Sequence, residues 1–145
     1  MAKTRTKLGN TTLRLPGEAG VAAVEMALVL PILLVLLFGI IDFGLALYTK
    51  EVLANASREG ARQGIRFVTP MLTDSDIETI TKDTLDKGYL DSSKATVTVT
   101  NAGGGFGTDL TVNIQYLFDF LVVSAFVPGM TSQITLQSTT VMSNE

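Results

Sequence analysis

Glu25 is the first residue of this chain whose type and position call for specific chemistry. It stands directly before sixteen uncharged residues, 26–41 (MALVLPILLVLLFGII). A carboxylate in such an apolar setting costs a few kcal/mol unless a cation or polar groups satisfy it. If the chain began at Val21, its terminal ammonium would lie about one helical turn away and could pair with Glu25, in the same chain or in a neighbouring subunit. The alternative is a Glu25 side chain that merely extends to the level of the lipid headgroups.

Most familiar catalytic chemistry is excluded by composition. With no His and no Cys, the chain cannot build a zinc finger, a Ser-His-Asp or Cys-His centre, a His-ligated haem or a disulfide. Ser124 and Lys94 are residue types that a Ser-Lys hydrolase uses, but they lie in no recognisable motif. We therefore expect no enzyme activity, no cofactor, no metal and no small-molecule substrate.

Two short motifs look like ligand sites but lack residues that such sites require. The acidic segment 74–78 could begin a calcium loop, but an EF-hand would need Gly in place of Thr79 and Glu in place of Leu85. The glycine-rich segment 101–107 lacks the Lys and the following helix of a phosphate-binding loop. The net charge of -3 also argues against nucleic-acid binding.

The apolar run predicts one transmembrane helix. Only Glu25 and Asp42 interrupt the uncharged sequence over residues 21–48. A helix of that length spans roughly 42 Å, and the hydrocarbon core of a bilayer is about 30 Å thick. The alternative of a buried core helix is weaker, because nothing else in so short a chain could surround a helix that is apolar on every side.

A cleaved secretory signal is a second alternative for the same run. Ala54-Asn55-Ala56 has the small-x-small pattern of a signal peptidase site. This pattern lies far beyond the apolar run, and the run is longer than a typical signal core. The membrane-anchored interpretation is therefore preferred.

The first twenty residues form a basic leader without an apolar face, so we expect them to be disordered in water. Basic residues lie on both sides of the apolar run, and the counts are equal, so the positive-inside rule alone does not orient the helix. These residues are Lys3, Arg5, Lys7 and Arg14 before it, and Lys50, Arg58, Arg62 and Arg66 after it.

The junction Gly20-Val21-Ala22-Ala23-Val24-Glu25 resembles the processing site of type IV prepilins and pseudopilins. The resemblance implies that a membrane-embedded prepilin peptidase cuts after Gly20 on the cytoplasmic side. Val21 would become the new N-terminus, and the basic leader would stay inside. A Glu near a helix N-terminus is also favoured by the helix dipole.

Within that superfamily the chain is most similar to TadE-like minor pseudopilins of the tight-adherence (Flp) pilus system. The similarity rests on segments 25–31 (EMALVLP), 42–44 (DFG) and 56–62 (ASREGAR). It implies a non-enzymatic subunit that takes part in pilus assembly. Its implied partners are the lipid bilayer, the prepilin peptidase, other pilin or pseudopilin subunits and inner-membrane pilus assembly proteins. The implied location is the bacterial cytoplasmic membrane, crossed once, with incorporation at the pilus base or tip left open. The alternative is an uncleaved single-span anchor whose extracytoplasmic domain binds another protein.

Beyond the membrane, residues 49–68 are compatible with a continuing helix. Ala56, Gly60 and Gly64 recur every four residues and form a stripe of small side chains that lets another element approach closely. Two glycines inside a helix cost about 1 kcal/mol each against Ala, which indicates a contact there. The sequence leaves open whether the contact is this chain's own sheet or a partner subunit.

The remaining sequence predicts a second helix and strands. The helix starts at the capping-box-like Thr73 and stops at Gly88. Strands are expected over residues 95–100, 110–116 and 134–142, the first two joined by the glycine-rich hairpin loop. The apolar connection 118–130 should lie against the long helix, the membrane surface or another subunit.

Together these elements predict an α+β protein with a long N-terminal helix, a short helix and a small antiparallel sheet of about three strands. We assign residues 1–20 to the leader, 21–48 to the transmembrane helix, 49–68 to its extracytoplasmic continuation, and 69–145 to a small α+β domain outside the cytoplasm.

Overall fold

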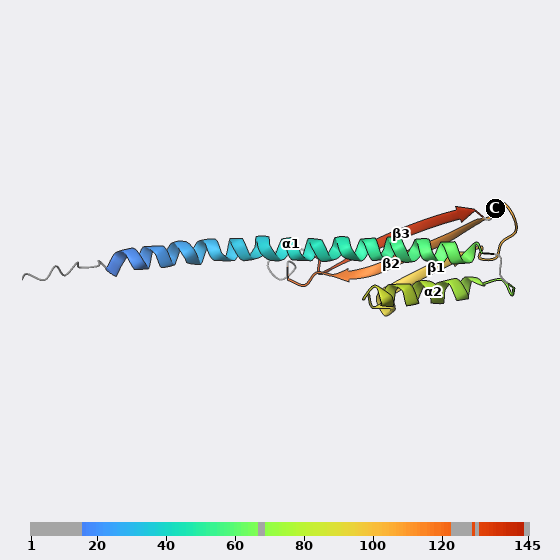
Figure 1. Cartoon of the computed structure of the whole chain (residues 1–145). Helices are drawn as coiled ribbons and strands as arrows, with labels where there is room; N and C mark the ends of the chain where they lie inside the picture. The colour runs from blue at the N-terminus through green and yellow to red at the C-terminus, as the bar shows by residue number, and fades with distance from the viewer. Residues whose placement is uncertain (1–15, 67–68, 123–128, 130, 144–145) are drawn as a thin grey trace, which may run out of the picture. The chain divides into compact units, whose positions relative to one another are not determined.

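A computed structural model describes residues 16–66, 69–122, 129 and 131–143, and Figure 1 shows its elements. They are helix α1 (Pro16–Gly64), helix α2 (Asp74–Lys87), the short 3₁₀ helix η1 (Ser92–Lys94), and strands β1 (Ala95–Thr100), β2 (Asp109–Asp119) and β3 (Gln133–Ser143). The predicted α+β class is confirmed, with its long N-terminal helix, second helix and three-stranded antiparallel sheet.

Two local predictions are wrong. Helix α1 already begins at Pro16, so residues 16–20 are helical and not disordered, while residues 1–15 lie outside the described part. Proline suits a first helical position because its fixed φ is helical and its missing N–H would have no intrahelical partner there. Strand β2 also continues to Asp119, so Phe118 belongs to the sheet and not to the connection. Phe118 keeps the inward alternation of the strand and is buried, which extends the strand by one more inward position.

The chain divides into two compact units, Met1–Leu36 and Leu37–Glu145. In the first unit, the described residues form the N-terminal part of α1, whose apolar side chains are largely exposed. The second unit contains the rest of α1, helix α2 and the sheet, and it holds the hydrophobic core. Only the second unit therefore has the packing of a globular domain.

The sheet has the order β1-β2-β3, and both pairs are antiparallel. Val97 pairs with Ile114, and Ile114 pairs with Ser138 on the other side. The central strand alternates strictly, because one face packs on the core and the other faces solvent. Its buried residues are Leu110, Val112, Ile114, Tyr116 and Phe118.

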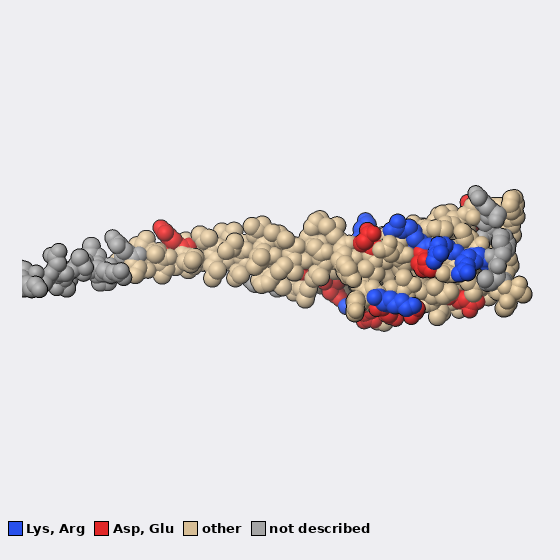
Figure 2. Space-filling view, viewed as in Figure 1, with Lys and Arg blue, Asp and Glu red and all other residues tan. Residues whose placement is uncertain are grey.

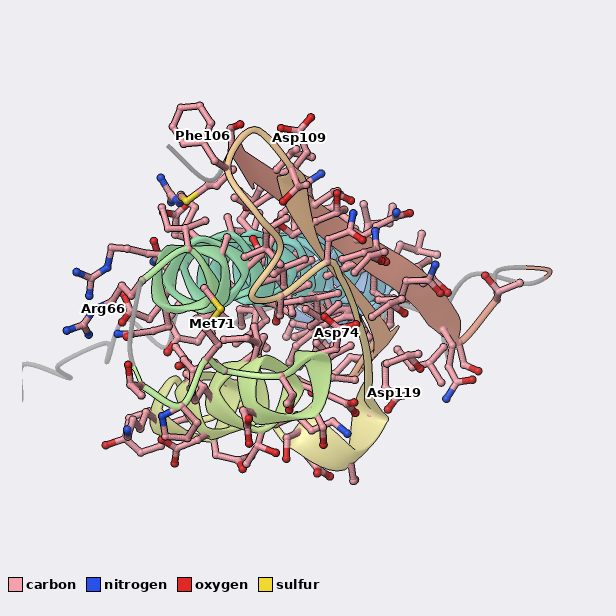
Figure 3. The ribbon with its side chains drawn as sticks, turned by 90° about the vertical axis from the view of Figure 1, so that its right-hand side faces the viewer. Arg66, Met71, Asp74, Phe106, Asp109 and Asp119 are labelled. Atoms are coloured by element: carbon pink, nitrogen blue, oxygen red, sulfur yellow. The ribbon has the colours of Figure 1, made fainter. Side chains whose placement is uncertain are left out.

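Both helices of the second unit cover the same face of the sheet, as the end-on view in Figure 3 shows. Helix α2 is fixed locally by a capping box: Thr73 Oγ1 accepts the Asp76 N–H, and the Asp76 carboxylate accepts the Thr73 N–H. It ends at Gly88, as predicted. Its buried residues, Ile77, Thr81 and Leu85, recur at helical spacing and form the side that enters the core.

Helix α1 approaches α2 closely because of its glycines. A Cβ built on Gly60 would lie 2.3 Å from Thr81 Oγ1, and one on Gly64 would lie 2.4 Å from Leu110 Cδ2. The Thr81 hydroxyl has little freedom to move, since it donates to the Ile77 carbonyl at 2.7 Å inside the core. The glycine stripe therefore sets the distance between α1, α2 and β2.

We expect Gly60→Ala to destabilise the second unit by about 1–2 kcal/mol, because overpacking outweighs the roughly 1 kcal/mol that Ala gains over Gly in a helix. Thermal unfolding of the full-length chain in detergent measures the effect. Gly44→Ala is the matched control in the same helix, since a Cβ there meets nothing within 4 Å. The double variant Gly60→Ala/Thr81→Ala removes the hydroxyl that the new methyl group meets, so it should regain part of the stability lost in Gly60→Ala. If the stability losses of the two single variants simply added up in the double variant, the contact between residues 60 and 81 would be contradicted.

Candidate functional site

The predicted junction lies within the first unit, inside an unbroken helix. Gly20, Val21 and Glu25 all belong to α1. Residues four apart share a helix face, so Val21 and Glu25 lie one turn apart on the same side. The Glu25 side chain and Val21 are exposed, and a Cβ on Gly20 would meet nothing within 4 Å. Nothing within the described part of the chain packs over this junction.

The apolar run after Glu25 has the exposure of a helix that faces lipid. Several of its large side chains are more than half exposed, among them Met26, Leu28, Ile32 and Leu36. Figure 2 shows this stretch without a charged side chain on the visible face, while Lys and Arg gather over the second unit. Among the described residues, α1 is the one helix long and apolar enough to cross a membrane. A large apolar surface of this kind needs a bilayer or a partner to cover it.

Comparison with protein families identifies the same segment. Residues 20–62 match the TadE-like protein family. The TadE-like match begins at Gly20 and ends at Arg62, so it includes the three sequence segments on which the predicted resemblance rests, and it confirms that resemblance. The family points to the tight-adherence (Flp) pilus system. No curated protein and no solved structure matches the chain.

Asp42 is a residue of the TadE-like segment whose structural role the sequence did not reveal. It is only 1% exposed. Its carboxylate accepts the backbone N–H groups of Leu121 and Val122, each at 3.2 Å. Asp42 therefore ties the chain that follows β2 to helix α1.

This contact resolves part of the prediction for the apolar connection 118–130. Two of its described residues after β2, Leu121 and Val122, donate their backbone N–H groups to Asp42 of the long helix. Residues 123–128 and 130 lie outside the described part of the chain. An acid placed directly after a long apolar run was the available sequence signal, because a carboxylate there needs hydrogen-bond donors.

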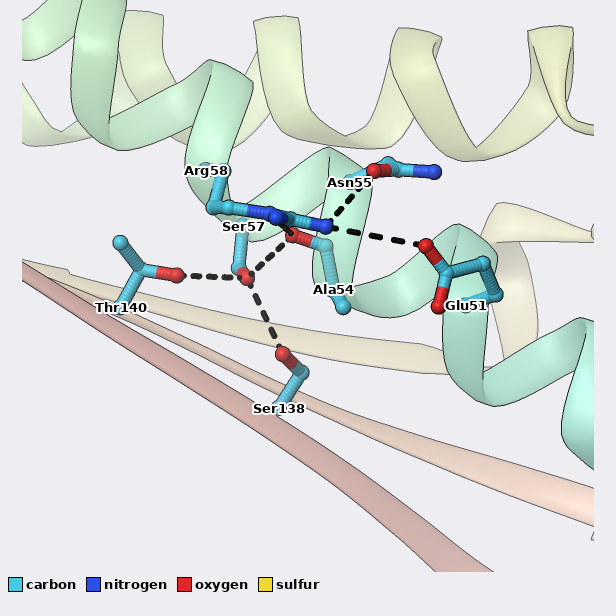
Figure 4. A network of polar contacts seen from close by, with 7 residues as sticks. All are labelled: Glu51, Ala54, Asn55, Ser57, Arg58, Ser138 and Thr140. Carbon is cyan, nitrogen blue, oxygen red and sulfur yellow. Dashed lines mark hydrogen bonds and ion pairs between the residues drawn. The ribbon is translucent and has the colours of Figure 1, made fainter.

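A second polar contact joins the TadE-like segment to the sheet, and Figure 4 shows it. The buried Ser57 hydroxyl lies 3.0 Å from Ser138 Oγ and 2.8 Å from Thr140 Oγ1 on β3. It also donates to the Ala54 carbonyl at 3.2 Å. Hydroxyl groups both donate and accept, so this cluster satisfies its members inside the packed layer.

The stripe of small residues on α1 lies in the interior of the second unit. Ala56, Gly60 and Gly64 are all buried. Gly60 faces Thr81 and Ile77 of α2, and Gly64 faces Leu110 of β2. The two glycines therefore contact the second helix and the sheet of the same chain, and Ala56 belongs to the same hydrophobic core.

Charged groups on α1 form local pairs along an exposed side. Arg62 contacts Glu59 at 2.9 Å, and Arg58 contacts Glu51 at 3.7 Å. The Gln63 hydrogen bond and then Arg62 hold the pKa of Glu59 below its usual range. Exposed ion pairs of this kind contribute about 0–1 kcal/mol each to folding stability. This side of α1 is therefore a solvated surface that adds little to the stability of the fold.

One ion pair joins the last residue of η1, directly before β1, to the last residue of β2. Lys94 Nζ lies 2.6 Å from Asp119 Oδ2, and this contact lowers the pKa of Asp119 and raises that of Lys94. The pair borders a hollow of about 230 Å³ that Tyr48 and Tyr89 also line. Within the described part of the chain, no three carboxylates gather as a metal site would require.

Proposed function

We propose that this chain is a non-enzymatic, minor pilin-like (pseudopilin) subunit of the tight-adherence (Flp) pilus system, cut after Gly20 by a prepilin peptidase. The observation that carries the proposal is the Gly20–Glu25 junction at the head of an exposed apolar helix, within the segment that matches the TadE-like family. The basic leader stays in the cytoplasm, and the second unit lies outside the cytoplasmic membrane. Its partners are the bilayer, the peptidase and other pilus subunits.

The chemistry of the proposed mature end follows from the helix geometry. Cleavage creates an ammonium group on Val21, one turn from the Glu25 carboxylate. Each charge alone is costly at the edge of a bilayer, but the two offset each other when they pair. The pair forms within one chain or between a mature end and the Glu25 of a neighbouring subunit. In the second case the pair forms only when the α1 helices of the two subunits are aligned so that the mature N-terminus of one lies beside Glu25 of the other.

The second candidate function is the uncleaved membrane anchor with an interaction domain. One observation favours it: α1 begins at Pro16, so the Gly20–Val21 bond lies inside a helix in the full-length chain. A protease must hold an exposed backbone segment to cut it, and a helix has to open first. An anchor keeps the leader and needs neither Gly20 nor Glu25.

Glu25→Ala tests the assembly role. We expect this variant to be cut after Gly20 as usual but to lower surface piliation at least tenfold, because the new ammonium loses its partner. Tenfold corresponds to about 1.4 kcal/mol, the order of one hydrogen bond to a charged group. Piliation is counted by electron microscopy in cells whose own copy is deleted.

Glu51→Ala is the matched control, since Glu51 is an exposed acid on the same helix whose Arg58 contact is long. We expect it to pilate normally. Normal piliation in Glu25→Ala would contradict the proposed mechanism. An equal loss of piliation in Glu25→Ala and Glu51→Ala would also contradict it.

A further inference from the structure

Strand β3 presents one edge of the sheet. The order β1-β2-β3 leaves β3 paired on one side, with β2. Within the described part of the chain, no strand pairs with its other side. The pairing with β2 runs without a bulge from Gln133 opposite Asp119 to Ser143 opposite Asp109. The edge is therefore long and regular.

The register identifies which backbone groups face outward. Phe120 N–H donates to the Ser132 carbonyl at 2.9 Å, one step beyond the last ladder pair. Directly opposed residues of an antiparallel pair alternate between bonded and non-bonded positions, so every second residue from Ser132 onward bonds to β2. The intervening residues direct their N–H and C=O groups to the open edge. They are Gln133, Thr135, Gln137, Thr139, Val141 and Ser143, and all are exposed.

This edge lacks the features that protect sheet edges. Natural proteins blunt an open strand with charged residues, proline, bulges or short length. Strand β3 (QITLQSTTVMS) has eleven residues and contains no charge, no proline and no glycine. The opposite edge strand, β1, has six residues and follows Lys94 directly. Of the two edge strands in the described sheet, β3 therefore offers the longer stretch for pairing.

The inward side of β3 is also incompletely covered. Ile134, Leu136 and Met142 pack against the core but remain partly exposed. Their partners on β2, such as Tyr116 and Leu110, are buried. A further strand beside β3 would shield this row if it carried apolar residues at alternate positions.

We propose that β3 accepts an antiparallel strand from a different protein chain, which extends the sheet to four strands. Backbone N–H and C=O groups spaced along a strand are matched by another extended polypeptide, and this is the basis of recognition by strand addition. The proposal rests on the role of an assembly subunit described above, but not on cleavage after Gly20.

The direction of β3 argues against a second copy as the partner. Asp42 bonds residues 121–122, which precede β3, and Ser57, further along α1, contacts Ser138 and Thr140. Strand β3 thus runs in the same direction as the helix it packs against. Two copies joined antiparallel through β3 would place the Leu37 ends of their second units, where the chain leads into the apolar part of α1, at opposite ends of the joined sheet, and two copies anchored in one membrane would have to span that separation. Parallel pairing is less stable per residue, so a strand of another chain fits better.

Site-specific crosslinking tests the proposal, because the chain contains no Cys of its own. Thr135→Cys and Thr139→Cys are introduced singly into the full-length chain, in cells that carry the pilus system, and are coupled to a thiol-directed photocrosslinker. We expect both to reach one segment of one other protein. The residue reached from Thr139 should precede the residue reached from Thr135, as an antiparallel strand requires. Thr98→Cys, on the outer face of β1, is the control and should not reach that segment.

Proline substitution tests the backbone contact itself. Gln137→Pro removes an N–H that faces the open edge, and we expect the crosslink yield from Thr139→Cys to fall about tenfold. Val99→Pro removes an N–H that, by the same alternation, faces away from β2 in β1, and the yield should not change. Gln137→Lys adds a charge to the open edge and keeps every backbone hydrogen bond of the chain. If the proline variant is unstable, this variant replaces it, and the same fall in crosslink yield is expected.

Several results would overturn the proposal: no other chain reached from either position, equal labelling from Thr98, labelling of a second copy, or partner positions that rise with those of β3. The N-terminus of the same crosslinked chain is read in parallel. If a chain that keeps its leader gives the ordered crosslinks, the proposed cleavage after Gly20 is wrong, while the proposal that β3 accepts a strand is supported. A processed chain without crosslinks would do the reverse.

Discussion

Gly20→Val is expected to leave the leader on the chain in cells that contain a prepilin peptidase. The reason is local to the cut bond, because the resemblance places Gly20 directly before it and a branched side chain there obstructs the protease. The fold gives no competing explanation, since a Cβ at Gly20 meets nothing within 4 Å. Intact mass spectrometry of the membrane-extracted chain should show the full-length species alone, where the unsubstituted chain is shortened by its first twenty residues.

Gly17→Val is the matched control for this experiment. Gly17 lies in the same helix, three residues earlier, and a Cβ there also meets nothing within 4 Å. Both substitutions therefore change helix propensity by a similar amount. If Gly17→Val blocked shortening equally, the effect would belong to the helix and not to the cut bond. If Gly20→Val were shortened normally, the assignment of the site would be wrong.

Asp42→Ala is expected to destabilise the second unit by about 2–3 kcal/mol. The carboxylate is buried and accepts two backbone N–H groups, and hydrogen bonds to a charged group contribute roughly 1.5–3 kcal/mol each. Its loss leaves the N–H groups of Leu121 and Val122 without this acceptor. The thermal midpoint in detergent and the amide exchange of these two residues measure the effect.

Asp42→Asn separates the hydrogen bonds from the rest of the side chain. The amide keeps one oxygen of nearly the same position, so we expect a smaller loss of stability and faster exchange at one of the two N–H groups. Unchanged exchange at Leu121 and Val122 in Asp42→Ala would show that the two contacts carry no stability.

The parts of the fold that the sequence predicted are those set by neighbouring residues. The start and stop of α2 follow from the Thr73 cap and from Gly88, and both are confirmed. The strands were recognisable from their alternation, which depends only on side chains two positions apart. The TadE-like resemblance is carried by a continuous segment, and the family match confirms it.

The parts that could not be predicted depend on residues far apart in the chain. Asp42 finds its donors at Leu121 and Val122, some eighty positions away, and Ser57 finds Ser138 at a similar separation. The glycine stripe predicted a close contact, but its spacing could not select α2 in addition to the sheet. The same holds for the open edge of β3, because strand order is a property of the assembled sheet.

The mature N-terminus of the chain is the most direct test of the central claim, the cut after Gly20. It is read by mass spectrometry after expression with and without a prepilin peptidase. The account predicts a chain that begins at Val21 only when the peptidase is present. An intact start at Met1 or Ala2 under both conditions would contradict it in favour of the uncleaved anchor, and a start at Ser57 would contradict it in favour of a secreted domain released by signal peptidase.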